Sequence, residues 1–195
     1  MKKFIIILLL VPVFALGQNK KTKNLLAEIE GQYSLDESGY VTYQKIIEVP
    51  ETSKDVLFSR AETHVAITYN DANSVIQSKD KDTGILIGKG IYGDIFTFPG
   101  IFTAYCSFSH NLRIDCKDNK ARISISLTEL KEKRVASGDA AYMDFKISEI
   151  YPLKLDGKEK NITGQAFYYA HKRVLADIST IEDALKGKGN ISDEW

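Results

Sequence analysis

Two segments that alternate apolar and polar residues, joined by a short polar turn, constrain the fold of this chain most. Within residues 105–116 the apolar side chains share one parity, with His110 the one exception among them. Residues 121–130 alternate in the same way, and the polar turn 117–120 lies between the two segments. A period of two residues is typical of a strand with one buried face. The pair therefore predicts an antiparallel hairpin.

Further elements are expected on both sides of this hairpin. A strand is predicted at 40–49, ended by Pro50, and a second hairpin at 74–80 and 85–92, with Gly84 in its turn. Between them we expect a helix capped by Thr52 or Ser53. The apolar stripe of that helix is Leu57, Phe58, Ala61, Val65 and Tyr69. For residues 131–160 we expect mostly irregular structure, with room for a short strand at 142–150.

The last element predicted is a long helix from about residue 164 to residue 186. Its apolar seam has the spacing 4-3-4-3-4 and consists of Phe167, His171, Val174, Ile178, Ile181 and Leu185. Because the seam covers fewer than three heptads, packing on the chain's own sheet is favoured over a coiled coil. The predicted fold class is α+β. A single curved antiparallel sheet carries a helix after its first strand and the long C-terminal helix on one face.

The N-terminus has the pattern of a secretory signal peptide. Lys2 and Lys3 precede an apolar run at 4–16, and Ala15 and Gly17 place small residues before a cleavage point at Gln18. A run of 13 residues is shorter than the roughly 20 needed to span a bilayer. Gln18 also stands where a lipid-anchored protein needs cysteine. We therefore expect a signal peptide at 1–17 and an exported, periplasmic or secreted protein with no transmembrane segment after cleavage.

The rest of the chain is expected to form one domain. Residues 18–38 are predicted to be a polar leader loosely attached to a single α+β domain at 39–186. That domain comprises a core at 39–130 and the C-terminal helix at 164–186, and a polar tail follows at 187–195. The 26 basic and 26 acidic side chains balance, and loss of residues 1–17 leaves a net charge of −2. Nucleic-acid-binding domains need a basic surplus, so no nucleic-acid partner is expected.

Two motifs suggest chemistry that their context does not support. Gly88, Gly90 and Gly93 match the dinucleotide-binding pattern G-x-G-x-x-G, but a β-like segment and Pro99 follow where that site needs a helix. We interpret these glycines as relief for strand twist, a bulge or close packing. Cys106, His110 and Cys116 share one strand, and ten residues of strand span roughly 33 Å. This separation excludes a shared metal ion, and it favours two buried, unpaired thiols over a disulfide.

No catalytic constellation is visible in the sequence. His64, His110 and His171 all lie on or beside apolar stripes, and the chain has neither a G-x-S-x-G elbow nor an H-E-x-x-H motif. We therefore predict no catalytic residue, no cofactor and no metal site, with a hydrolase as the weakest alternative.

Several motifs resemble the bacterial family known as domain of unknown function 4468, which has a TATA-binding-protein-like fold. The resembling residues are 45–50, Leu57, Arg60, Ala61, 75–77, Asp80, 88–90, the hairpin 105–130 and the closing residues Asp193, Glu194 and Trp195. His64 stands where the family pattern has Trp. The resemblance implies the fold and export, but no activity. DNA binding does not follow from it, because the outward-facing strand residues include only Arg113 and Arg122 as basic side chains.

An aromatic-rich stretch at 94–105 is the candidate partner or ligand surface. Its rings are Phe96, Phe98, Phe102 and Tyr105. They either extend the sheet and join the core or form an apolar loop that meets a partner. The predicted function is that of an exported, non-catalytic domain that binds a protein or envelope partner through this loop or the sheet face. The alternative is a carrier that holds an apolar small molecule between the C-terminal helix and the sheet.

Overall fold

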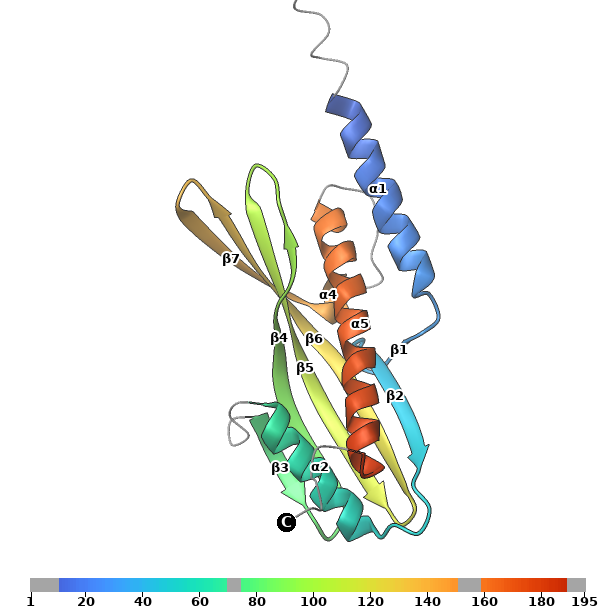
Figure 1. Cartoon of the computed structure of the whole chain (residues 1–195). Coiled ribbons are helices and arrows are strands. Elements are labelled where there is room, and N and C mark those ends of the chain that lie inside the picture. Colours follow the sequence, from blue (N-terminus) through green and yellow to red (C-terminus); the bar gives the residue numbers. More distant parts are fainter. Residues whose placement is uncertain (1–10, 70–74, 151–158, 189–195) are drawn as a thin grey trace, which may run out of the picture.

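A seven-stranded antiparallel sheet forms the frame of the computed structural model, which describes residues 11–69, 75–150 and 159–188 (Figure 1). Its strands are β1 (Ser34–Leu35), β2 (Val41–Glu48), β3 (Ile76–Asp80), β4 (Ile85–Phe98), β5 (Thr103–Lys117), β6 (Lys120–Ala136) and β7 (Asp139–Lys146). The strand order is β1-β2-β6-β5-β4-β3, and β7 pairs with β6 off this path. The predicted strand at 40–49 and both predicted hairpins are confirmed.

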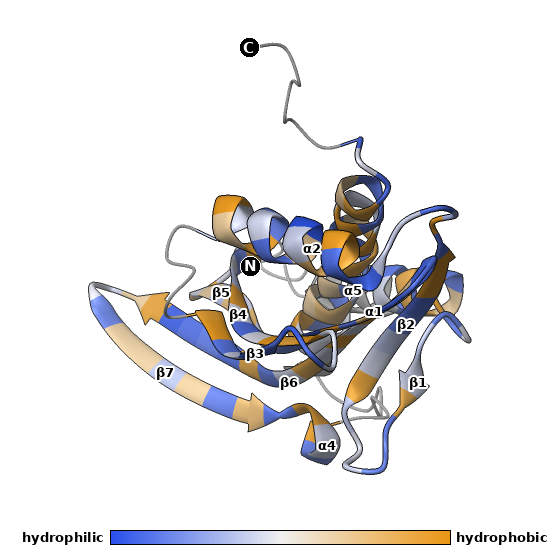
Figure 2. Ribbon diagram, turned by 90° about the horizontal axis from the view of Figure 1, so that it is seen from below, coloured by the Kyte–Doolittle hydropathy of each residue, from blue (hydrophilic) through white to orange (hydrophobic). Residues whose placement is uncertain are grey.

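Two long helices cover one face of the sheet, as predicted (Figures 1 and 2). The helices of the described residues are α1 (Val11–Glu28), α2 (Lys54–Thr68), α4 (Ile147–Ile150) and α5 (Glu159–Leu185). The side chain of Ser53 caps α2 by accepting a hydrogen bond from the Val56 amide. Helix α5 ends in a turn at Gly187, where the Lys188 amide donates to the Asp183 carbonyl at 2.9 Å.

The core lies between these helices and the sheet. Alternate residues of β5 are buried from Ala104 to Cys116, as the period-two pattern predicts. All six residues of the predicted α5 seam are buried, and Phe108, Leu112 and Phe167 are among the largest side chains that are fully enclosed. Both cysteines are buried and unpaired, as expected. Among the described residues, large apolar side chains of α5 and of the sheet thus pack between the two.

Two irregularities interrupt the sheet at the same level of β5. In β4, Tyr92 pairs with Phe108 and Phe96 with Cys106, so β4 carries two extra residues there. The amide of Asp94, at φ 42°, donates to Ser107 Oγ at 2.9 Å inside this bulge. In β6, Thr128 is the extra residue, and its hydroxyl donates to the Ser109 carbonyl at 3.3 Å. Such bulges bend and twist a sheet.

Beyond the bulges the sheet continues as an extension that we call the arm. It consists of residues 95–98, 103–107, 129–136 and 139–146, and its two hairpin tips stand clear of α2 and α5 at the upper left of Figure 1. Strand β6 pairs with β2 before Thr128 and with β7 after it.

The arm corrects the expectation of mostly irregular structure at 131–160. Residues 131–146 form the β6–β7 hairpin, so the short strand allowed at 142–150 is present as far as Lys146, and 147–150 form α4. Residues 131–134 of β6 are all charged, and Lys131 forms a cross-strand ion pair with Asp144 of β7 (3.6 Å). An arm strand of this kind has no run of alternating apolar residues by which to recognise it. Residues 151–158 lie outside the described part of the chain.

The expected loose leader also differs from the structure. Helix α1 packs on α5, and Thr22 and Ile29 are fully buried. Glu28 accepts a hydrogen bond from Lys172 Nζ at 2.8 Å, which ties the end of α1 to α5. The helix runs across the cleavage point expected before Gln18. None of the helices in the described ranges combines the length and apolarity needed to cross a membrane.

The glycine motif lies within β4, and no helix begins at it. A Cβ atom on Gly90 would lie 2.6 Å from His110 Cε1 and 2.9 Å from Tyr69 Cε1. A Cβ atom on Gly93 would meet nothing within 4 Å. The interpretation of these glycines as relief for close packing is therefore confirmed at Gly90.

We predict that Gly90→Ala lowers the free energy of unfolding by about 1–3 kcal/mol, because the added methyl group overpacks the contact with His110. Gly93→Ala is the matched control in the same strand and should change stability by less than about 0.5 kcal/mol. Urea denaturation of the two variants measures both values. Equal stability of the two variants would contradict this account of Gly90.

Candidate functional site

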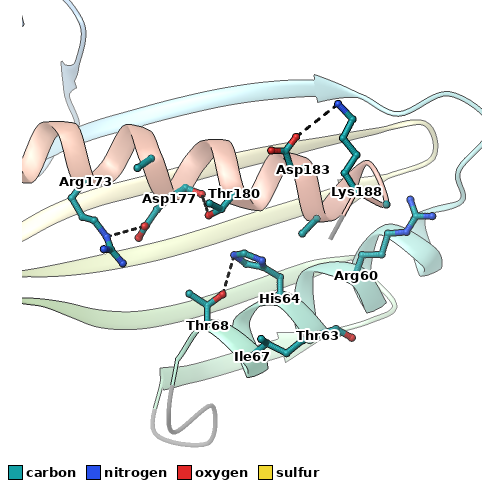
Figure 3. A pocket seen from close by; sticks show the side chains of 13 residues that line it. Arg60, Thr63, His64, Ile67, Thr68, Arg173, Asp177, Thr180, Asp183 and Lys188 are labelled. Atoms are coloured by element: carbon teal, nitrogen blue, oxygen red, sulfur yellow. Dashed lines mark hydrogen bonds and ion pairs between the residues drawn. The ribbon is translucent and has the colours of Figure 1, made fainter. Parts of the chain in front are cut away.

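A groove of about 620 Å³ runs between α2 and α5 on the outer surface of the helical layer (Figure 3). Helix α5 contributes the short side chains Ala176, Thr180 and Ala184, and α2 contributes His64 and Ile67. Residues four apart on a helix lie in one row along its surface. The row on α5 is too short to fill the space between the helices, and Ile67 is left 73% exposed.

The charged groups of the groove are mostly held by partners. Arg173 Nε lies 3.0 Å from Asp177 Oδ1, and Lys188 Nζ lies 4.0 Å from Asp183 Oδ1. Arg60 Nη1 donates to the Leu185 carbonyl at 2.8 Å, which joins α2 to the end of α5. These five side chains, three cations and two acids, are the charged residues that line the groove.

His64 lies on the α2 side of the groove. Its Nε2 is 3.3 Å from the Thr68 hydroxyl, a contact drawn as a dashed line in Figure 3. Burial lowers the pKa of this histidine, so the ring is neutral at physiological pH. The residue that departs from the family pattern thus presents an uncharged, polar side chain to the groove.

A second cavity of about 550 Å³ continues the groove toward β4 and shares Thr68, Arg173 and Asp177 with it. Tyr92 lines this cavity, and the Arg173 guanidinium lies over the Tyr92 ring at 5.7 Å from its centroid.

His110 lies beneath Tyr92 and stacks on its ring, with the ring centroids 4.0 Å apart. Its Nε2 is 3.1 Å from the Tyr69 hydroxyl. Its Nδ1 is buried without a hydrogen-bond partner among the described residues. Burial, aided by the charge of Arg173, lowers the pKa of His110 to about 4.

The side chains that could act as nucleophiles or ligands are not brought together. Cys106 and Cys116 lie apart along β5, and burial raises their pKa values to about 12 and about 11, so both thiols are protonated. His171 is enclosed in the core, with Nδ1 3.1 Å from the Tyr43 hydroxyl. Within the described ranges, no group of three or more His, Cys, Asp or Glu side chains could hold a metal ion.

The four rings predicted as one surface lie on two different faces of the arm. Phe96 and Phe98 pair with the buried residues Cys106 and Ala104 and therefore face the helices. The ring of Phe96 stacks on Tyr169 of α5 at 5.2 Å between centroids. Phe102, packed against the core, lies under the Arg134 guanidinium at 4.9 Å.

Tyr105 faces the opposite, open side of the arm. Lys133 Nζ lies 5.9 Å from the ring centroid of Tyr105 and 5.9 Å from that of Tyr142. Tyr142 is 73% exposed, and Ile101, in the turn between β4 and β5, is fully exposed. Neither Lys133 nor Tyr142 was predicted as a surface residue. Mostly irregular structure was expected at 131–160 with a short strand at 142–150, and the pairing of Lys133 with Tyr142 has no apolar pattern to indicate it. The groove was not predicted either, and its one signal in the sequence is the row of short side chains on α5.

Comparison with known proteins supports the predicted resemblance and fold. Residues 43–131 match the family model described as domain of unknown function (DUF4468) with TBP-like fold. A TBP-like protein from Parabacteroides distasonis ATCC 8503 is similar in structure, with a TM-score of 0.57, 17% identity, and coverage of 78% of this chain and 96% of that chain. A DUF4468 family protein from Bacteroides ovatus ATCC 8483 has a TM-score of 0.55, 12% identity, and coverage of 84% and 95%. A search of curated proteins found no match.

The burial of His110 predicts how stability depends on pH. Its pKa is about 4 in the folded chain and 6.5 when it is exposed, so the unfolded chain alone binds a proton between these values. The free energy of unfolding therefore falls as the pH falls from 6.5 to 4, by about 3 kcal/mol for this one group. His110→Phe removes this contribution. Urea denaturation across the same pH range should give a flatter profile for the variant, and equal slopes would contradict the prediction.

Proposed function

We propose that this chain, whose residues 43–131 match a DUF4468 domain with TBP-like fold, is an exported, non-catalytic domain that binds a protein partner through its arm. The matched family is one of unknown function, so the proposal rests on this chain's own geometry. The observation that carries it is an exposed row of side chains on the open face of the arm.

This row crosses three neighbouring strands. Tyr105 of β5 pairs with Lys133 of β6, which pairs with Tyr142 of β7. The lysine ammonium lies 5.9 Å from the centroid of each ring, within reach of a cation–π contact with both. Ile101 adds a fully exposed apolar side chain at the tip of the neighbouring hairpin. Tyrosine is enriched in protein interfaces because it offers a large, rigid surface with a polar end.

The position of the row also favours a role in binding. It lies beyond the bulges, where the open face of the sheet carries no helix (Figure 1). Core burial does not require Tyr142, which is 73% exposed, or Ile101. Exposed apolar side chains that gather in one patch are typical of interaction surfaces.

The body of the sheet supports a protein partner over a nucleic acid. Arg113 and Arg122, the two basic side chains noted on the outward parity, both bind the same carboxylate. Their distances to Asp115 oxygens are 2.7 Å and 3.1 Å. A sheet that binds a phosphate backbone needs cations that are free to replace counterions. On this face, Arg113 and Arg122 are instead paired with Asp115.

The carrier alternative is less well supported. In the space between α5 and the sheet, where it would hold an apolar molecule, the described residues include the fully buried side chains Phe108, Leu112 and Phe167. The described groove lies instead between α2 and α5, and its rim is charged. Export remains part of the proposal on the evidence of residues 1–17.

The test is site-specific photocrosslinking in cells that express the full chain. A photoreactive residue at Tyr142 should form an adduct with a single protein. Ile46, which is 63% exposed on β2, is the matched control and should form none. Ile101→Ser combined with Tyr142→Ser should weaken binding of that protein at least tenfold without changing the melting temperature. Absence of an adduct at position 142, or the same adduct at both positions, would contradict the proposal.

A further inference from the structure

Strand β7 borders the sheet, and no described strand pairs along its outer edge (Figure 2). The main-chain groups of such an edge can pair with a strand of another molecule. We propose that the protein partner of the arm is a second copy of this chain, bound by antiparallel pairing of β7 with β7 of that copy. This inference rests on the proposed function, because it names the partner of the same surface.

The turn between β6 and β7 fixes the hydrogen-bond pattern of the hairpin. Ser137 and Gly138 form a two-residue loop with φ values of 50° and 93°, as in a type I′ turn. Ala136 and Asp139 flank this loop and pair with each other, so they exchange both of their main-chain hydrogen bonds.

This pattern shows which groups of β7 point outward. The register continues from Asp139 to Lys146 without a shift, and hydrogen-bonded pairs alternate along an antiparallel ladder. Ala140, Tyr142 and Asp144 therefore direct their N–H and C=O groups away from β6. These are the groups that a second strand can bind.

A two-fold axis perpendicular to the sheet is the symmetry that joins two such edges. It keeps the same face of both copies on the same side, so residues of the open face lie opposite residues of the open face. One residue of β7 then lies opposite its own copy, because the contact uses the same surface twice. We assign this position to Tyr142, whose main-chain groups point outward and whose side chain is 73% exposed.

This register extends the exposed row that crosses the arm. Within one copy, Tyr105 pairs with Lys133 and Lys133 pairs with Tyr142. With Tyr142 opposite Tyr142 of the second copy, the two rows meet end to end on one face of a continuous sheet. Aromatic side chains directly opposite each other stabilise such a strand pair. The second copy thus contributes the other half of one surface.

The remaining side chains of β7 are compatible with this register. Residues 139–145 of one copy lie opposite residues 145–139 of the second. The opposed side chains are Met143 and Ala141, Asp144 and Ala140, and Phe145 and Asp139. Each of these pairs sets a long or charged side chain against one that does not carry the same charge. Like charges directly opposite each other, which destabilise a sheet, are therefore avoided.

Analytical ultracentrifugation of the purified full chain should give the mass of two copies. Asp144→Pro removes an outward N–H group, which β6 does not use, and should give single copies. Asp144→Ala is the matched control, because it removes the same side chain and its ion pair with Lys131 but keeps the N–H group. It should remain a dimer. The melting temperatures of both variants verify that each is folded.

An introduced cysteine tests the register. Cys106 and Cys116 are buried, so the introduced thiol is the accessible one. Tyr142→Cys should form a disulfide between two copies under mild oxidation, because the Cα atoms of hydrogen-bonded pairs lie about 5.5 Å apart. Ala140→Cys is the matched control and should form none, since its two copies would lie about 14 Å apart along the strands. Electrophoresis without a reducing agent measures both.

Four results would overturn the proposal. They are a full chain with the mass of one copy, a dimer that Asp144→Pro leaves intact, a disulfide that forms as readily at position 140 as at position 142, and a photoadduct at position 142 with a different protein. The last result would leave the proposed function standing, whereas the absence of any photoadduct would contradict both. A photoadduct with the mass of two copies supports both.

Discussion

The pairing of β5 with β6 is the constraint on which the other elements depend. The two strands pair from Thr103 to Lys117, and the pairing fixes which side chains of each strand face the helices. Strand β4 pairs along β5, while β2 and β7 share the other edge of β6. Because one face of this hairpin is apolar, α2 and α5 must both lie on it. The opposite face is left polar and open.

The parts of the fold that could be predicted are those in which burial follows a simple period. This holds for the alternation in β5 and in the first half of β6, and for the 4-3-4 seam of α5. In each case one face of the element is buried along its whole length. The second half of β6 could not be predicted in this way. The extra residue Thr128 moves the buried parity from odd to even positions, and Glu132, although buried, is charged and paired with Arg134.

The candidate sites depend on tertiary geometry that no local pattern contains. Phe98 and Tyr105 are close in sequence, but strand pairing places them on opposite faces of the arm, because Phe98 pairs with Ala104, the neighbour of Tyr105. Tyr142 is brought beside Tyr105 by a strand that has no apolar period. The groove exists because two helices far apart in sequence lie side by side, and short side chains on one of them matter only when the other is present.

The bulge in β4 also affects the tendency of the exposed edge of the sheet to aggregate. Strand β3 pairs with β4 only as far as Gly88, so residues 89–98 form an edge that no other described strand pairs along. A flat edge of that length, containing Ile91, Phe96 and Phe98, would be a template for adding strands from other molecules. The bulge at Asp94 twists the edge and puts a charge in its middle. The irregularity that bends the sheet therefore also opposes aggregation.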